Sequence, residues 1–245
     1  MKKGSMRQLS RMAGCVALWG MISSSAMANL ITNGNFENGT NGWTVVNIGE
    51  VGAVLATNTA AQSPFSSGSA GFQMTDGSVN TTQYISTVFG AQVDGQYTLS
   101  FDYKMLAANN SLWIGRIRNS TTADTSFDFT IGTNSLKVGA STVATGLSVG
   151  TWYHVSMILD SAADKVLSGS ITPNGGSATT WGQIAGYAIT AQIKSLMISD
   201  TSSPNVAPSI YLDNVSLTVI PEPATIGMLG LGALITLLIR RQCMK

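Results

Sequence analysis

Few residues between Asn29 and Ile220 could carry out catalytic chemistry. This segment has one histidine, His154, no cysteine and two glutamates. A Ser-His-Asp set would need a distant serine, and no Gly-x-Ser-x-Gly nucleophile motif is present. The acidic pairs Asp124/Asp128 and Asp160/Asp164 would suit a glycosidase only at a separation of about 5 to 10 Å. The second pair is more typical of a turn after a strand, so the sequence predicts a protein that is not an enzyme.

Aromatic side chains could instead recognise sugars, because a flat ring offers an apolar platform beside polar groups that bind hydroxyls. Trp152 and His154 share the outward parity of one predicted strand, and Trp113 lies close to Arg116. Trp181 lies in a segment rich in glycine and threonine. These five residues are the candidate ligand-binding residues. Packing in the core is the alternative for each tryptophan, since a sandwich also needs large buried rings.

One carboxylate interrupts an apolar pattern near the end of this segment. Asp213 has the same parity as Tyr211, Val215 and Leu217, which predicts that it points inward. A buried charge needs amide donors or a cation. Calcium is the ion that oxygen-rich sites in exported β-domains usually bind. With Glu37 as the second ligand, the pattern predicts one structural calcium. The alternative is that Asp213 accepts backbone hydrogen bonds at the mouth of a strand.

The elements that must position these residues are predicted to be strands. Polar and apolar residues alternate in YTLSFDYKM (97–105), WYHVSMILD (152–160) and IYLDNVSLTV (210–219), as half-buried strands require. Turn sequences such as Asn174-Gly175-Gly176 separate them. No internal repeat or long linker divides the segment. We therefore expect one all-β domain over 29–220, a two-sheet antiparallel sandwich of jelly-roll type.

The charge of this domain differs from that of the whole chain. It has six Lys and Arg against eleven Asp and Glu, a net charge of −5, whereas the chain carries +1. A nucleic-acid partner is therefore excluded, because phosphates require clustered basic residues. Both cysteines, Cys15 and Cys243, lie outside the domain, which must fold without a disulfide.

The first 28 residues have the pattern of a secretory signal peptide. Lys2, Lys3, Arg7 and Arg11 precede an apolar stretch, and Ala26-Met27-Ala28 offers a cleavage site. The apolar stretch is too short to span a bilayer, which needs about 20 residues. A lipoprotein site at Cys15 is the alternative, but the apolar stretch follows that cysteine. The pattern predicts a signal-peptide helix over 1–28 and export across the inner membrane.

The last 25 residues, 221–245, predict a membrane anchor. Pro221-Glu222-Pro223 favours a rigid extended spacer, and the 16 residues that follow it carry no charge before Arg240 and Arg241. As a helix they would be about 24 Å long, so they predict a short transmembrane helix with its basic end in the cytoplasm. A buried core helix is the alternative, and it explains the terminal arginines poorly.

This tail resembles the sorting signal of the PEP-CTERM family of bacterial exported proteins. The resemblance rests on the Pro-Glu-Pro of residues 221–223, the apolar helix and the arginines at 240 and 241. It implies that an exosortase, a membrane-bound processing enzyme, recognises the tail. It also implies a membrane-anchored precursor, and then a place at the surface or in the exopolysaccharide matrix of a Gram-negative bacterium.

The domain itself resembles two kinds of glycan-binding sandwich. The segments NGNFE (33–37) and IYLDNV (210–215) resemble the two ends of carbohydrate-binding jelly rolls, whose first Glu and last Asp hold a structural calcium, here Glu37 and Asp213. GTWYHVSMILD (150–160) resembles a strand of laminin-G sandwiches. Both resemblances imply stacked antiparallel sheets and, in many members, glycan binding. We therefore expect a non-catalytic domain that binds extracellular polysaccharide. A structural matrix or adhesion protein without a defined glycan, and a polysaccharide-acting enzyme, are the two alternatives.

Overall fold

The computed structural model describes residues 28–46, 54–75, 83–92, 94–106, 112–119, 125–185, 193–201 and 209–221, with Gly230, Thr236 and Arg240. The predicted signal peptide and most of the predicted anchor, including Glu222, Pro223 and Arg241, lie outside these residues. Within the described ranges, no helix has the length and apolar character needed to cross a membrane. The predicted domain boundaries therefore stay predictions.

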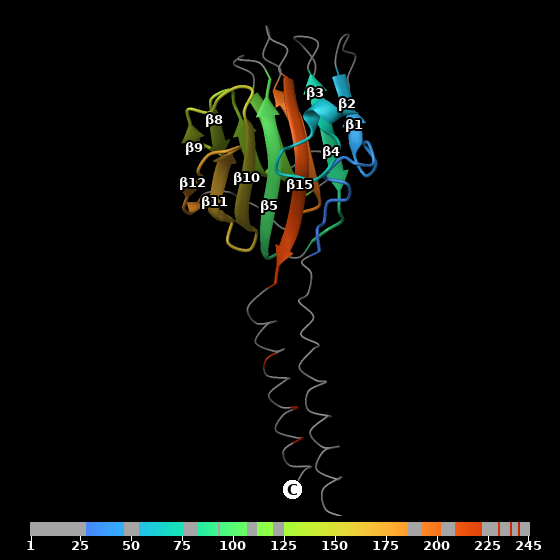
Figure 1. Ribbon diagram of the computed structural model, residues 1–245. Helices are drawn as coiled ribbons and strands as arrows, with labels where there is room; N and C mark the ends of the chain where they lie inside the picture. The colour runs from blue at the N-terminus through green and yellow to red at the C-terminus, as the bar shows by residue number, and fades with distance from the viewer. Residues whose placement is uncertain are drawn as a thin grey trace, which may run out of the picture.

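The described residues contain fifteen strands in two antiparallel sheets (Figure 1). The eight-stranded sheet has the order β12 (Thr179–Trp181), β11 (Lys165–Pro173), β10 (Trp152–Asp160), β5 (Gln96–Met105), β15 (Ser209–Ile220), β3 (Gly71–Thr75) and β2 (Val54–Asn58), and β13 (Ile184–Ala185) pairs with β11. The seven-stranded sheet has the order β1 (Thr44–Val46), β4 (Tyr84–Val88), β14 (Ser195–Thr201), β6 (Leu112–Arg118), β7 (Thr125–Ile131), β8 (Ser135–Val138) and β9 (Ser141–Thr145). One 3-10 turn, η1 (Thr59–Ala61), follows β2. The predicted two-sheet sandwich is confirmed.

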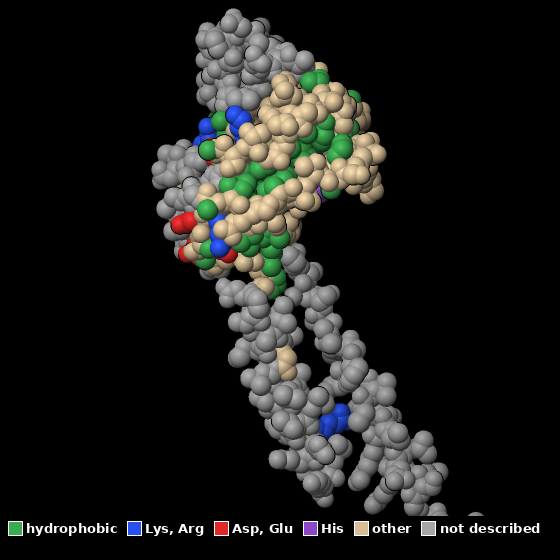
Figure 2. All heavy atoms as spheres, turned by 90° about the vertical axis from the view of Figure 1, so that its left-hand side faces the viewer, with side chains coloured by type: hydrophobic (Ala, Val, Ile, Leu, Met, Phe, Trp, Pro, Cys, Tyr) green, Lys and Arg blue, Asp and Glu red, His purple; other side chains and the backbone are tan. Residues whose placement is uncertain are grey.

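Alternation in the central strands builds the core between the two sheets. In β5 the odd-numbered residues from Tyr97 to Met105 are buried, and in β10 those from Tyr153 to Leu159 are buried, as predicted. Phe101 of β5 stacks on Phe129 of β7, with ring centroids 4.8 Å apart, and so joins the two sheets. At one edge of the sandwich, Figure 2 shows hydrophobic side chains gathered between two bands of other atoms. The even-numbered residues of β5 and β10 therefore form the outer face of the eight-stranded sheet.

A β-bulge in β15 makes part of the predicted parity wrong. Ile210 and Leu212 are fully buried, whereas Tyr211, which was expected to point inward, is half-buried on the outer face. Between Asp213 and Ser216 the register with β5 shifts, and Asn214 has a φ of 51°. The extra residue reverses the alternation, so Val215 and Leu217 are buried as predicted. Asp213 is buried too, but it lies in register with Asp102 on the outer face.

Both ends of the sandwich lie at the same pole. Asn29 forms an isolated bridge with Thr218 near the end of β15, and the backbone N–H of Leu30 donates to the carbonyl of Leu217 at 2.8 Å. Pro221 follows directly after the last residue of β15. All fifteen described strands lie between Asn29 and Pro221, so both sheets are built from residues of the predicted domain 29–220.

Candidate functional site

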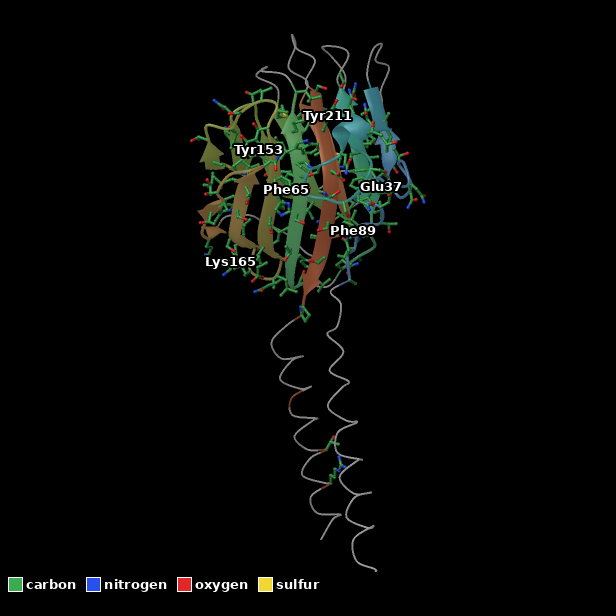
Figure 3. The ribbon with its side chains drawn as sticks, in the orientation of Figure 1. Glu37, Phe65, Phe89, Tyr153, Lys165 and Tyr211 are labelled. Carbon is green, nitrogen blue, oxygen red and sulfur yellow. The ribbon has the colours of Figure 1, made fainter. Side chains whose placement is uncertain are left out.

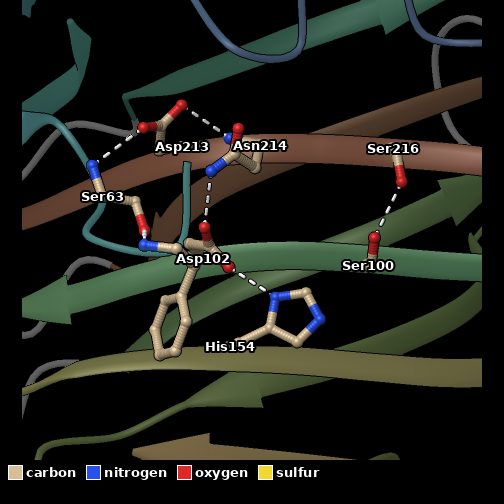
Figure 4. A network of polar contacts seen from close by, with 8 residues as sticks. Ser63, Ser100, Asp102, His154, Asp213, Asn214 and Ser216 are labelled. Carbon is tan, nitrogen blue, oxygen red and sulfur yellow. Dashed lines mark hydrogen bonds and ion pairs between the residues drawn. The ribbon is translucent and has the colours of Figure 1, made fainter. Parts of the chain in front are cut away.

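A row of polar side chains crosses the outer face of the eight-stranded sheet, from β10 through β5 to β15 (Figure 4). His154 Nδ1 lies 2.6 Å from Asp102 Oδ1, and the side-chain amide of Asn214 donates to Asp102 Oδ2 at 2.6 Å. Antiparallel register places His154 opposite Asp102, and Asp102 opposite Asp213. The bulge adds Asn214 to the row, because it turns this side chain back toward β5.

Burial makes Asp102 an orienting group for the histidine. Asp102 has no exposed surface, whereas 37% of the His154 side chain is exposed. Each carboxylate oxygen of Asp102 has a partner, so the buried charge is compensated. The Nδ1 contact fixes the ring and leaves Nε2 on the side away from the carboxylate. This arrangement presents an oriented imidazole at the surface of the sheet.

A strap, Gln62–Ala70, crosses this part of the outer face between η1 and β3. The backbone N–H of Ser63 donates to Asp213 Oδ2 at 2.8 Å, and Asp213 Oδ1 accepts the N–H of Asn214 at 2.7 Å. At the other end of the strap, the N–H groups of Ser69 and Ala70 donate to Glu37 Oε1 at 2.6 and 3.0 Å. The strap is therefore held at both ends by carboxylates.

The surroundings shift the pKa values of these two carboxylates in opposite directions. Burial, the largest cause, raises the pKa of Asp213 from 3.8 to about 6, and the nearby charges of Asp102 and Glu37 contribute in the same direction. The hydrogen bonds from Ser69 and Ala70 hold the pKa of the exposed Glu37 below its usual value. Glu37 is therefore ionised at neutral pH, whereas Asp213 titrates in the mildly acidic range.

Phe65 stands at the middle of the strap, and the sequence analysis missed it. Its side chain is 38% exposed, and its ring centroid lies 5.7 Å from that of His154. Figure 3 shows it over the centre of the outer face, where β5 and β10 run side by side. Its sequence context, Ser-Pro-Phe-Ser-Ser-Gly, could have identified it. A single aromatic residue in such a turn-rich segment has no alternating apolar neighbours, so it is not part of a half-buried strand.

Beside Phe65 and His154 lies a hollow of about 640 Å³. Its other polar lining residues carry amide, hydroxyl or carboxylate groups: Asn29, Asn33, Asn35, Ser100, Asp102, Asn214 and Ser216. Ser100 and Ser216 hydrogen-bond to each other at 2.7 Å across β5 and β15. No lysine or arginine lines this hollow among the described residues. The hollow thus offers many neutral hydrogen-bonding groups beside one aromatic ring.

A second row of side chains lies on the same three strands, two residues along each strand from the first row. Lys104 Nζ is 5.2 Å from the ring centroid of Trp152 and 4.9 Å from that of Tyr211, which are cation–π distances. Burial lowers the pKa of Lys104. Trp152 does share the outer face with His154, as predicted, but only 8% of it is exposed. Its ring packs against Lys104 and Tyr211 and leaves little surface for a ligand.

The structure does not bring the other three candidate ligand residues to this site. Trp113 is fully buried in the core, so its predicted role as a platform is wrong. Its parity on β6 makes it an inward residue opposite Ile131. Arg116 lies on the seven-stranded sheet, where Nη1 contacts Ser199 Oγ at 3.4 Å. Trp181 covers the edge of the core above Gly169 of β11, where a Cβ atom would lie 2.2 Å from the indole ring.

Neither the calcium prediction nor the acidic pairs gain support from the geometry. Asp213 and Glu37 both use their oxygens to accept amide hydrogens, which is the alternative considered for Asp213. Across the described ranges, no group of three His, Cys, Asp or Glu side chains is arranged to hold a metal. Asp160 Oδ1 accepts the N–H of Ala163 in the turn after β10, as the turn interpretation expects. Asp124 lies outside the described residues.

Comparisons with known proteins identify the tail and the fold. Residues 219–242 match the PEP-CTERM protein-sorting motif, which begins within β15 and includes Pro221 and Arg240. No significant match to a curated protein is found. The match confirms the predicted sorting signal, which implies export, membrane-anchored processing in bacteria and an exosortase as processing enzyme.

Several solved structures share the sandwich. A sialidase aligns with a TM-score of 0.56 and 12% identity, over 76% of this chain and 18% of the sialidase. The lectin UEA-II, complexed with galactose, aligns at 0.50 and 10%, over 73% and 92%. An endo-β-1,4-glucuronan lyase from the fungus Trichoderma reesei aligns at 0.52 and 14%, over 74% and 92%. The chain spans less than a fifth of the sialidase, and identities this low show the fold alone. The chain is thus a two-sheet antiparallel β-sandwich, a fold that these structures share, and it carries a PEP-CTERM protein-sorting motif at residues 219–242.

Proposed function

We propose that this protein is an exported glycan-binding protein, processed through its sorting motif and placed at the cell surface or in the exopolysaccharide matrix of a Gram-negative bacterium. The observation that carries the proposal is the hollow on the outer face of the eight-stranded sheet, lined by amides and hydroxyls beside the exposed ring of Phe65. Sugar recognition needs this combination of an apolar platform with several hydrogen-bonding groups. The domain binds without chemical change to the glycan.

The charges around the hollow favour neutral or amino sugars over acidic ones. Asp102 lines the hollow, and Glu37 and Asp213 lie close enough to affect each other's charge. No described lysine or arginine lines the hollow to compensate these three carboxylates. A uronic acid would meet like charge there, whereas hydroxyl or ammonium groups would find acceptors.

A glycan array tests this function. Residues 29–220 are applied to immobilised neutral, amino and acidic oligosaccharides, with His154→Ala as the site variant and Arg116→Ala on the opposite sheet as the matched control. We expect retention on neutral or amino sugars that His154→Ala loses and Arg116→Ala keeps. If no glycan on the array retains the wild type or the control, a structural matrix role would be favoured.

A polysaccharide-acting enzyme is the second candidate, and the Asp102–His154 pair favours it. A buried carboxylate that orients an exposed imidazole is the arrangement by which proteins position a general base. Incubation of the purified domain with the glycans it retains, followed by measurement of released reducing ends, separates the two functions. Release that disappears in both His154→Ala and Asp102→Asn would establish catalysis, whereas unchanged glycan would leave binding as the function.

A further inference from the structure

The strap over the outer face is ordered by its own hydrogen bonds. Ser63 Oγ accepts the N–H of Phe65 at 3.1 Å, and Ser66 Oγ accepts the N–H of Gly68 at 3.0 Å. The carbonyl of Ser63 accepts the N–H of Ser66 at 3.3 Å, and the side chain of Gln62 donates to the carbonyl of Gly68. Hydroxyl-to-backbone bonds of this kind fix short turns. The position of Phe65 within the strap is therefore defined.

Two carboxylates from distant parts of the chain fix the strap to the sandwich. Asp213, 150 residues beyond Ser63, holds its first half. Glu37 holds its second half through Ser69, which donates both its N–H and its hydroxyl, each at 2.6 Å. Gly68 lies so close to Glu37 that an added Cβ atom would be 2.3 Å from Oε1. Bonds to ionised acceptors are stronger than neutral ones, so these contacts determine where the strap lies.

The result is an aromatic ring, 38% exposed, at the rim of the hollow. Among the described residues, the exposed large hydrophobic side chains are Phe65 and Val88, and Val88 lies on β4 of the other sheet. The exposed part of the Phe65 ring gives up the free energy that its burial would provide. The hydrogen bonds of Glu37 and Asp213 nevertheless hold the strap in this position. Phe65 thus offers an aromatic surface beside a polar hollow, the combination that sugar recognition uses.

We infer that Phe65 is the platform on which a sugar ring of the bound glycan stacks, and that Glu37 and Asp213 are positioning residues that hold it in place. This inference rests on the proposed glycan-binding function and identifies the contact that carries it. The sugar presents its apolar face to Phe65, while its hydroxyls reach the amides and serines of the hollow. His154, at 5.7 Å from Phe65, forms the wall behind the platform.

The test compares variants of residues 29–220 on soluble tetramers of β-1,4-linked glucose, N-acetylglucosamine, glucosamine and galactose. An aromatic contact contributes to affinity beyond its burial, so Phe65→Ala should weaken binding about two- to twelvefold. Phe65→Trp should retain binding, and Val88→Ala, the matched control at the other exposed hydrophobic side chain, should bind as wild type. Upfield shifts of the sugar ring protons should accompany binding to wild type and be lost in Phe65→Ala.

The positioning role has its own readout. Glu37→Ala should abolish the nuclear Overhauser contact between the Phe65 and His154 rings, and Glu37→Gln should restore it because the amide oxygen still accepts the Ser69 N–H. If the released strap places the ring correctly about a third of the time, apparent affinity falls about threefold. Binding by wild type and Phe65→Ala with equal affinity would overturn the platform and leave the proposed function standing. Failure of wild type to bind any tetramer would overturn both.

Discussion

The buried carboxylate of Asp213 should make the stability of the sandwich depend on pH. Its pKa is about 6 in the folded protein against an ordinary value of 3.8, mainly because it is buried. Between these two values the folded protein holds a proton that the unfolded chain has lost. Acidification from pH 7.5 therefore favours the folded state at this residue, and the gain is complete below pH 3.8. The linkage relation gives a gain of about 2–3 kcal/mol between pH 7.5 and pH 4.

The variant Asp213→Asn isolates this contribution, because asparagine cannot titrate. Urea unfolding of residues 29–220, followed by tryptophan fluorescence at several pH values, gives the free energy of unfolding for wild type and variant. The stability of Asp213→Asn relative to wild type should fall by about 2–3 kcal/mol from pH 7.5 to pH 4. Titration of groups distant from Asp213 is common to both proteins and cancels in this difference.

Asp164→Asn is the matched control for this measurement. Asp164 is an exposed acid with a φ of 51° in the turn between β10 and β11, a conformation that asparagine also adopts readily. It should follow the wild-type pH profile. A constant difference between wild type and Asp213→Asn across the range would refute the reasoning, as would the same fall in Asp164→Asn.

Three further outcomes are expected. Gly115→Ala should lower the free energy of unfolding by about 1–3 kcal/mol in urea, because its Cβ atom would lie 1.9 Å from the Phe129 ring. Addition of calcium or of a chelator should leave the thermal midpoint of the domain unchanged, since amides satisfy Glu37 and Asp213; a rise of several degrees with calcium would restore the metal site. Deletion of residues 221–245 should move the protein from the membrane fraction to the soluble exported fraction, detected by fractionation and blotting.

The fold could be predicted from the sequence where the pattern is local. The alternation in β5 and β10 identifies the odd-numbered residues of these two strands as buried. It does so because side-chain direction in a regular strand depends only on parity. In β15 the same rule failed at Tyr211, since Asn214 takes a left-handed conformation that reverses the parity. An Asn in a strand gives a weak signal for such a bulge, because many strands tolerate it on the exposed face.

The candidate site depended on contacts that parity cannot reveal. His154 was found because it shares the outward parity of its strand with Trp152, but its partner Asp102 lies on another strand, 52 residues away. Phe65 was missed because a turn-rich segment does not indicate which surface it will cross. Asp213 was predicted to need amide donors or a cation, and Glu37 was predicted only as a second calcium ligand. Both accept N–H groups of the strap, which only the folded chain brings to them.

The place of β15 in the sheet has a consequence for biogenesis. It follows all the other described strands along the chain, yet it lies between β5 and β3 and also bridges to Asn29. The two halves of the eight-stranded sheet therefore cannot join until this strand has paired. The sorting motif shares Val219 and Ile220 with β15, so the strand that completes the sheet also carries the first residues of the motif. A defect in the pairing of β15 would therefore disturb both the sheet and the start of the motif.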